Sequence, residues 1–224
     1  MIDEQDKPKV EDERRYLREL RDRKPSPYPK LLMRLGNKRN VSLYSRSMTF
    51  DSYVEAYFQA ARKLSSEAPS SAVFNYSGLP ILFLYRHFVE LVLKASLNAL
   101  VELIREHSGS FDFPIREIHH LNSLLDDLRT LHEAAKPYLG DLELPSKQAR
   151  DFIRELSDYD EKSYKFRYPH PKGSTQPAID EDMSFNLDVL DAGMLHVYKE
   201  LKRYWDTVAI LTGLYQDYKE ASRA

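Results

Sequence analysis

The sequence predicts an all-α fold, an up-and-down helical bundle of about five helices with an irregular N-terminal arm. Three observations predict it. Apolar residues recur at helical spacing in several segments, the apolar–polar alternation of strands is nearly absent, and stretches rich in Pro, Gly and Ser separate the segments. We therefore expect two parts: a charged, partly disordered arm over 1–48 and a helical bundle domain over 49–224.

The first two predicted helices cover 50–66 and 79–107. Thr49 is a suitable N-cap for the first, because its hydroxyl can accept a backbone N–H bond. Pro80 suits the first turn of the second, and Gly109 closes it. Apolar residues cover most of the circumference of this second helix, which indicates a central helix contacted on several sides.

Two shorter helices and a connection follow. The third helix is predicted over 120–136 and ends before Pro137, because proline disrupts a continuing helix. The fourth covers 146–160 with Ser146 as its cap. The proline-rich segment 166–182 is too long for a simple turn and leads to the last helix.

The last helix carries the most regular pattern in the chain, an apolar seam spaced alternately by three and four residues. The seam consists of Leu187, Leu190, Met194, Val197, Leu201, Tyr204, Val208, Leu211, Tyr215 and Tyr218. Such a heptad repeat packs against a neighbouring helix. We expect the seam to face mostly the core of the bundle; the alternative is that its far end pairs with a second copy of the chain.

Composition and charge exclude several classes of protein. Of the 224 residues, 42% are hydrophobic and 30% charged, as in ordinary globular proteins. The absence of cysteine excludes disulfides, thiolate metal sites and cysteine nucleophiles. No segment approaches the ~20 apolar residues that span a bilayer, and no apolar secretory signal begins the chain. We therefore expect a soluble, cytoplasmic protein without a membrane partner.

The charge is unevenly distributed, although the formal net charge is only −2. Residues 1–49 contain 13 Lys and Arg against 8 Asp and Glu, whereas the remainder contains 20 against 27. A basic arm on an acidic body can contact a phosphate backbone or an acidic partner. The alternative is a solvated leader without a binding role.

A polar column along the second helix is the first candidate site. Its members, each four residues after the last, are Arg86, Glu90, Lys94, Asn98, Glu102 and Glu106, with His87 beside the first. Residues at this spacing share one helix face. The column is either a solvent-facing stripe or, near Arg86, a pocket whose Arg, His and Glu bind phosphate or transfer protons.

Two further clusters carry chemistry. His119 and His120 diverge by about 100° at a helix start, so they suit a cap rather than a metal pair, and we expect neither a metal nor a cofactor. The segment 166–170 contains Arg167, Tyr168 and His170 after the acidic run 158–161. It is either structural, with its Arg paired to one of those acids, or a base-stacking and phosphate-gripping element.

Taken in order, these motifs resemble the HEPN superfamily of helical domains associated with nucleotides and RNA. Members show a helix with Glu before a Leu-Lys-Ala stretch, similar to 90–95 here. A His-x-Leu-x-x-Leu motif opens the next helix, similar to 119–125, and an Arg-Tyr-Pro precedes the final helix, similar to 167–169. The resemblance covers roughly 50–215 and does not extend to the arm.

The ribonucleases of that superfamily carry an Arg, about four to six residues and then a His. No His in this chain has an Arg at that distance upstream; Arg167 and His170, for example, have only two residues between them. The resemblance therefore implies a non-catalytic or divergent member that binds RNA, a nucleotide or a partner protein. It also implies dimerisation through the bundle and a bacterial defence or toxin–antitoxin setting.

Three functions follow as hypotheses. The first is non-catalytic binding of RNA, a nucleotide or a protein, with the ligand held by Arg86, His87, Glu90, Lys94, Arg167 and Tyr168. The second is a divergent, metal-independent ribonuclease in which His87 or His170 is the catalytic base. The third is a structural protein that assembles, as a homodimer or larger oligomer, through the seam of the last helix.

Overall fold

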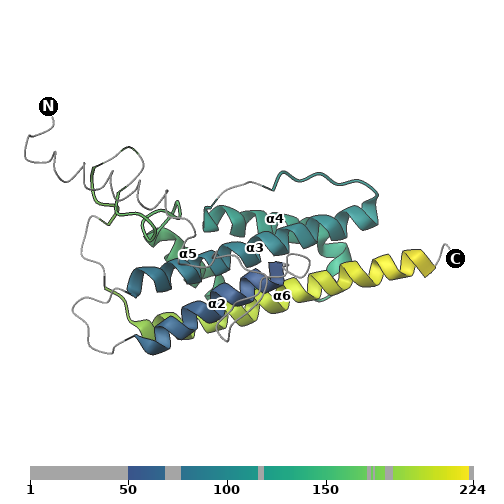
Figure 1. The fold of residues 1–224 in the computed structure, drawn as a ribbon. Helices are drawn as coiled ribbons and strands as arrows, with labels where there is room; N and C mark the ends of the chain where they lie inside the picture. The colour runs from purple at the N-terminus through teal and green to yellow at the C-terminus, as the bar shows by residue number, and fades with distance from the viewer. Residues whose placement is uncertain are drawn as a thin grey trace, which may run out of the picture. The chain divides into compact units, whose positions relative to one another are not determined.

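A computed structural model describes residues 50–68, 77–115, 119–170, 173, 175–179 and 184–221. The expectations for the arm 1–48 and for Thr49 as a helix cap concern residues outside this part of the chain. Five helices make up the described structure, and no strand occurs among its residues (Figure 1). They are α2 (Phe50–Glu67), α3 (Gly78–Ser108), α4 (Leu121–Leu139), α5 (Lys147–Tyr159) and α6 (Leu187–Ala221). The predicted all-α helical bundle is confirmed.

Two of the predicted helix ends have the expected geometry. Gly109 follows α3 in the left-handed region, with φ of 79°, and its N–H donates to the carbonyl of Arg105 at 2.9 Å. The Ser146 hydroxyl accepts the N–H of Ala149 at 3.3 Å and so caps α5. A glycine therefore marks the C-terminal end of α3, and a serine hydroxyl marks the N-terminal end of α5.

The end of α4 differs from its prediction. The helix does not stop before Pro137 but includes it and continues to Leu139. A proline in the last turn costs little there, because only one helical hydrogen bond is lost close to the end. Packing favours the longer helix: Leu139 is buried and the Tyr138 ring stacks on His107, with centroids 4.2 Å apart.

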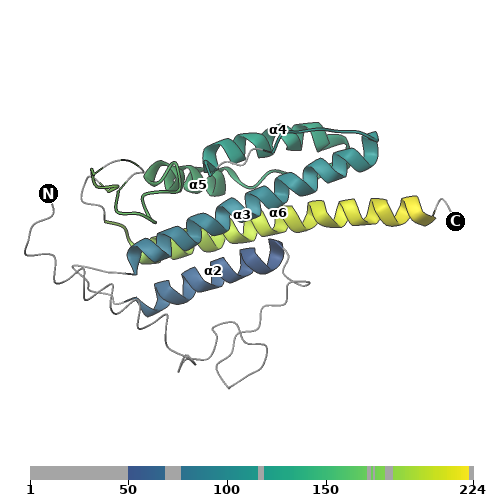
Figure 2. The same cartoon turned by 45° about the horizontal axis from the view of Figure 1, so that its top comes forward.

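Helix α4 runs in the same direction as α3, so the predicted up-and-down alternation is not kept at this connection. Before α4 begins, Nδ1 of His119 lies 2.8 Å from the Glu90 carboxylate, and near its end Tyr138 stacks on His107. The two contacts fix both ends of α4 along α3 (Figure 2). The connection 109–120 is long enough for this return of the chain: if extended, it spans about 40 Å, whereas the stretch of α3 between those contacts spans about 26 Å.

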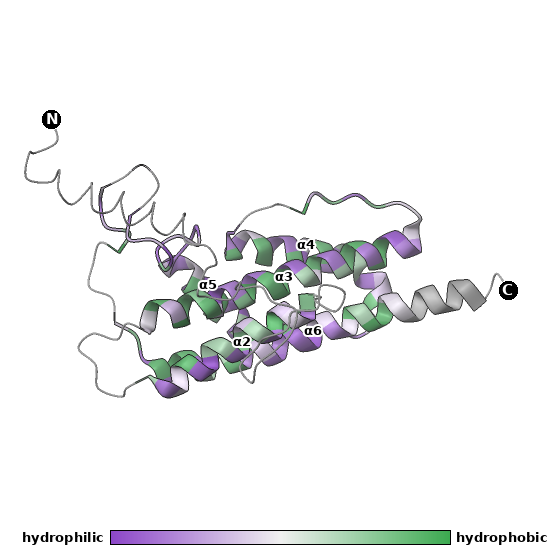
Figure 3. Ribbon diagram, viewed as in Figure 1, coloured by the Kyte–Doolittle hydropathy of each residue, from purple (hydrophilic) through white to green (hydrophobic). Residues whose placement is uncertain are grey.

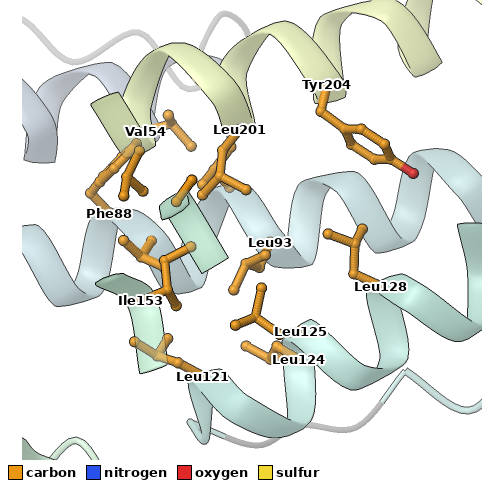
Figure 4. Packing of buried hydrophobic residues seen from close by; sticks show 14 of the residues in the cluster. Val54, Phe88, Leu93, Leu121, Leu124, Leu125, Leu128, Ile153, Leu201 and Tyr204 are labelled. Carbon is orange, nitrogen blue, oxygen red and sulfur yellow. The ribbon is translucent and has the colours of Figure 1, made fainter. Parts of the chain in front are cut away.

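Helix α3 is the centre of the bundle, as predicted. Val54 of α2, Leu93 of α3, Leu125 of α4, Ile153 of α5 and Leu201 of α6 all belong to one buried cluster (Figure 4). The helices that surround α3 show both hydrophobic and hydrophilic residues along their length, as amphipathic helices do (Figure 3). No helix in the described part of the chain is both long and apolar enough to cross a membrane.

The heptad seam of α6 faces the core over most of its length. Its buried members are Leu190, Met194, Val197, Leu201, Tyr204 and Val208. Leu187 and Leu211, at either end of this run, are partly buried and pack against the same cluster. The side chains of Tyr215 and Tyr218 lie outside the described ones. Between Leu190 and Val208 the seam is therefore core and not a surface for assembly.

Candidate functional site

The Arg86 side chain is fully buried in the first half of α3. Its Nε donates to the carbonyl oxygen of Asp160 at 2.9 Å, and its terminal nitrogens donate to the Glu90 carboxylate and to the carbonyls of His119 and Glu161. Burial lowers the pKa of Arg86, while the nearby Asp160 and Glu90 carboxylates oppose that effect. The guanidinium thus joins α3 to the start of α4 and to the end of α5.

Glu90, one turn further along α3, is also buried and collects cationic partners. Its Oε2 faces Arg86 at 3.3 Å, and its Oε1 accepts from Lys94 Nζ at 2.9 Å and lies 2.8 Å from His119 Nδ1. Burial alone would raise the pKa of this carboxyl, but the hydrogen bonds from Lys94 and His119 hold the pKa below its usual value. Glu90 is therefore a carboxylate at neutral pH.

Asp160 completes what we call the buried ion cluster, made of Arg86, Glu90 and Asp160. Its Oδ1 accepts the backbone N–H groups of Tyr164 and Lys165, at 2.6 and 3.0 Å, and so shapes the turn after α5. Its Oδ2 is buried, accepts no hydrogen bond in the structure, and faces Arg86 Nε at 3.8 Å. A buried cluster of this kind fixes geometry more than it adds stability.

His119 and Lys94 connect the buried ion cluster to the surface. The His119 side chain is 54% exposed and that of Lys94 is 22% exposed, whereas Glu90 beneath them is 2% exposed. Because Nδ1 of His119 is held by the carboxylate, Nε2 is the ring nitrogen left to meet a ligand. The arrangement presents one oriented imidazole and one ammonium group side by side.

A second group of side chains, which we call the cation–aromatic patch, consists of Phe83, His87, Arg167 and Tyr168. The His87 ring stacks on Phe83, with centroids 5.6 Å apart and planes within 12°. The Arg167 guanidinium lies 5.8 Å from the Phe83 ring and 5.5 Å from that of Tyr168. Burial lowers the pKa of His87, so its ring is neutral at pH 7.

The buried ion cluster and the patch adjoin. His87 follows Arg86 in α3 and its ring stacks on Phe83, over which Arg167 lies, and the charges of Glu90, Arg167 and Lys94 all influence the pKa of His87. The structure thus brings together five of the residues singled out from the sequence: Arg86, His87, Glu90, Lys94 and Arg167. Of the predicted polar column, the first two members, Arg86 and Glu90, are buried, whereas Lys94 is partly exposed and Asn98 is exposed.

Tyr168 joins this group, but His170 is held within its own loop. The exposed Tyr168 ring lies against Tyr164, with centroids 4.7 Å apart. His170 Nδ1 instead faces the carbonyl of Gln176 at 3.1 Å. Arg167 Nε donates to the carbonyl of Ser163 at 2.6 Å, and the acid of this region, Asp160, pairs with Arg86 instead. One alternative for the segment 166–170 was an ion pair between Arg167 and an acid of 158–161. In the structure that acid, Asp160, pairs with Arg86.

Two residues of the site were not identified as such from the sequence. The sequence favours one of the two histidines as a cap of α4; in the structure His120 is the N-cap residue, its side chain makes no capping bond, and His119 binds Glu90. Asp160 was noted only within an acidic run. The sequence does contain one signal for this site: Glu90 and Lys94 are four residues apart on a largely apolar helix. A carboxylate buried there requires hydrogen-bond donors beyond Lys94, and His119 is one of them. Among the described residues, no three His, Asp or Glu are grouped to hold a metal ion.

Comparisons with family models, with curated proteins and with solved structures found no match to this chain. The resemblance to the HEPN superfamily therefore stays a prediction. What the chain does must be inferred from the cluster and the patch themselves.

Proposed function

We propose that this chain is a non-catalytic, HEPN-like binding domain that takes up a nucleotide unit, either free or within RNA. In this proposal Lys94 and Arg167 contact the phosphate, joined by His119 when both of its ring nitrogens carry a proton, and the aromatic rings of the cation–aromatic patch stack on the base. The proposal draws its setting, a bacterial defence or toxin–antitoxin system, from the family resemblance alone.

The observation that carries the proposal is the pairing of His119 and Lys94 with one buried carboxylate. Glu90 fixes both groups at 2.8 and 2.9 Å, so they are oriented before a ligand arrives. Around it, Arg86, Lys94 and Arg167 supply three positive charges. Donors that are both oriented and positively charged favour an anion such as phosphate.

The patch supplies the second half of nucleotide recognition. Phe83 and His87 present stacked rings, and Arg167 lies over the aromatic faces of Phe83 and Tyr168. Stacking of a base on an aromatic ring contributes about 1–3 kcal/mol and tolerates different bases. We therefore expect modest sequence preference and strong salt dependence.

Fluorescence anisotropy with labelled single-stranded RNA, and calorimetry with ATP, test the proposal. Lys94→Ala and Arg167→Ala should each weaken binding about tenfold and reduce the salt dependence by about one phosphate contact. Lys147→Ala and Arg154→Ala are matched controls, because both residues pair with Asp151 on the surface of α5. Absence of binding at low salt, or equal weakening by the controls, would overturn the proposal.

A divergent ribonuclease is the second candidate, and the Glu90–His119 pair favours it. A carboxylate that holds Nδ1 and leaves Nε2 outward is the arrangement of a general base. This geometry favours His119 in that role over His87, which is stacked and partly buried, and over His170. Purified protein incubated with mixed RNA, beside a His119→Ala variant, decides between the candidates: no cleavage by the unaltered protein removes this one.

A further inference from the structure

An apolar groove lies between α5 and the start of α6, beside Leu82 of α3. Its volume is about 210 Å³, and the side chains that line it include Leu82, Phe152, Leu156, Tyr159, Phe185 and Val189. The three α5 residues lie at 152, 156 and 159, which places them on one helical stripe. The groove is separate from the buried ion cluster and from the cation–aromatic patch, since it shares no residue with either.

Large apolar side chains are exposed along this groove. Val189 is 62% exposed and Tyr159 is 47% exposed, and Phe185 is also among the exposed large hydrophobic residues. A neighbouring hollow shares Phe152 and Glu155 with the groove and extends it along α5 to Lys147. From Lys147 to Tyr159 the helix spans about 18 Å, the length of about three turns of a docked helix.

The edge of the groove formed by α5 is acidic. Glu155 is the charged residue among those that line the groove, and Asp158 lies on the same helix three residues later. Neither carboxylate forms an ion pair within the described part of the chain, because Lys147 and Arg154 both pair with Asp151 instead. A groove with exposed apolar walls and an uncompensated acidic edge suits a ligand with apolar and basic groups.

We propose that this groove binds a basic amphipathic helix from another protein. Apolar side chains of that helix enter between Val189 and Tyr159, and its Lys or Arg residues face Glu155 and Asp158. The mode is that of a helix laid in a hydrophobic groove. A second copy of this chain fits less well, because a two-fold axis through the groove would bring two copies of Glu155 toward each other.

The test uses the full chain and two labelled peptides of about 18 residues, one helical repeat of Leu and Lys and its counterpart of Leu and Glu. Anisotropy should show binding of the Leu/Lys peptide and much weaker binding of the Leu/Glu peptide. Val189→Asp should weaken the Leu/Lys complex about tenfold or more. Glu155→Lys should weaken it about threefold and strengthen binding of the Leu/Glu peptide.

Matched controls lie on other faces. Ile210→Asp also places a carboxylate at an exposed apolar residue of α6, since Ile210 is 60% exposed, and Asp126→Lys reverses a charge on the surface of α4. Both should leave the affinity unchanged within about twofold. Equal effects of the controls, or equal binding of both peptides, would overturn the proposal. So would sedimentation showing a dimer that Val189→Asp dissociates, because the groove would then be a contact between copies.

Discussion

The heptad seam of α6 and the buried ion cluster are both inaccessible to solvent, but they are specified in different ways. The seam is built from residues of one helix at a regular spacing, and each member only has to be apolar and of suitable size. In the cluster, by contrast, each polar atom needs a particular partner. The side chain of Arg86 alone contacts Glu90 of α3, His119 two residues before α4 and Asp160 directly after α5.

The seam and the buried ion cluster differ in how well they tolerate substitution. An apolar contact in the seam can relax when one side chain is shortened, and it loses only a part of its energy. A buried charge that loses its partner keeps the whole cost of its desolvation. We therefore expect the cluster to be the more sensitive region, although it contains far fewer residues than the seam.

Replacement of the central arginine should have the largest effect. Arg86→Ala leaves Glu90 and Asp160 without their buried cation, and we expect a loss of about 3–5 kcal/mol in the free energy of unfolding. Urea denaturation followed by circular dichroism measures it. Arg105→Ala, which removes an exposed pair with Glu102, should change stability by less than about 0.5 kcal/mol.

A double variant makes the comparison sharper. If the charge imbalance causes the loss, Arg86→Met combined with Glu90→Leu should be more stable than Arg86→Ala alone. An Arg86→Ala protein as stable as the unaltered chain would show that the two regions do not differ in the way we describe.

Truncation within the seam should have the next largest effect. Leu201 is fully buried, so Leu201→Ala should cost about 3 kcal/mol by loss of contacts and formation of a cavity. Ile210→Ala, at an exposed position of the same helix, is the control and should change the unfolding midpoint little. A cost at Leu201 no larger than the cost at Ile210 would contradict its place in the core.

A glycine of α6 tests how closely that helix meets α5. A Cβ atom at Gly193 would overlap the Phe152 ring, so Gly193→Ala should destabilise the protein by about 1–3 kcal/mol. At Gly213, no described atom outside the helix's own nearby backbone lies within 4 Å of an added Cβ, so Ala should stabilise the helix there by up to about 1 kcal/mol. Opposite signs at the two sites, read from thermal midpoints, are the expected result.

The smallest expected effect is a pH dependence near the cluster. Burial lowers the pKa of His87 in the folded state, so the unfolded chain binds more protons below about pH 6.5. Stability should therefore be complete above that pH and fall as the pH decreases toward the folded-state pKa. His87→Phe keeps a ring between Tyr57 and Phe83 and should reduce the fall of the thermal midpoint between about pH 7 and 5; part of the fall remains, because burial also lowers the pKa of His132. An unchanged slope would assign the dependence to other groups.

The helices were predictable because their signals are local. The seam of α6, the glycine after α3 and the serine before α5 each act over a few residues, and the structure agrees with all three. Pro137 is a position where a local rule, that proline ends a helix, gives the wrong boundary. Its effect depends on the buried Leu139 and on Tyr138, which stacks on His107 of α3, a residue distant in the sequence.

Only some residues of the candidate site were predictable, because the others depend on contacts between distant parts of the sequence. Arg86, His87 and Glu90 were visible as polar residues on an apolar helix, but nothing local indicates that Arg86 points inward to three carbonyl groups. The role of His119 depends on the direction of α4, and that direction follows from a connection with no regular pattern. Residues that meet only after the chain has folded cannot be assigned from spacing.

The connection 109–120 has a minimum length but no comparable maximum. It must carry the chain back over about 26 Å, and its residues, fully extended, reach about 40 Å, so the slack is only about four residues. Longer deletions would pull His119 away from Glu90, even though no residue of either helix had changed. Insertions, in contrast, would cost little, because closing a longer loop is penalised only logarithmically.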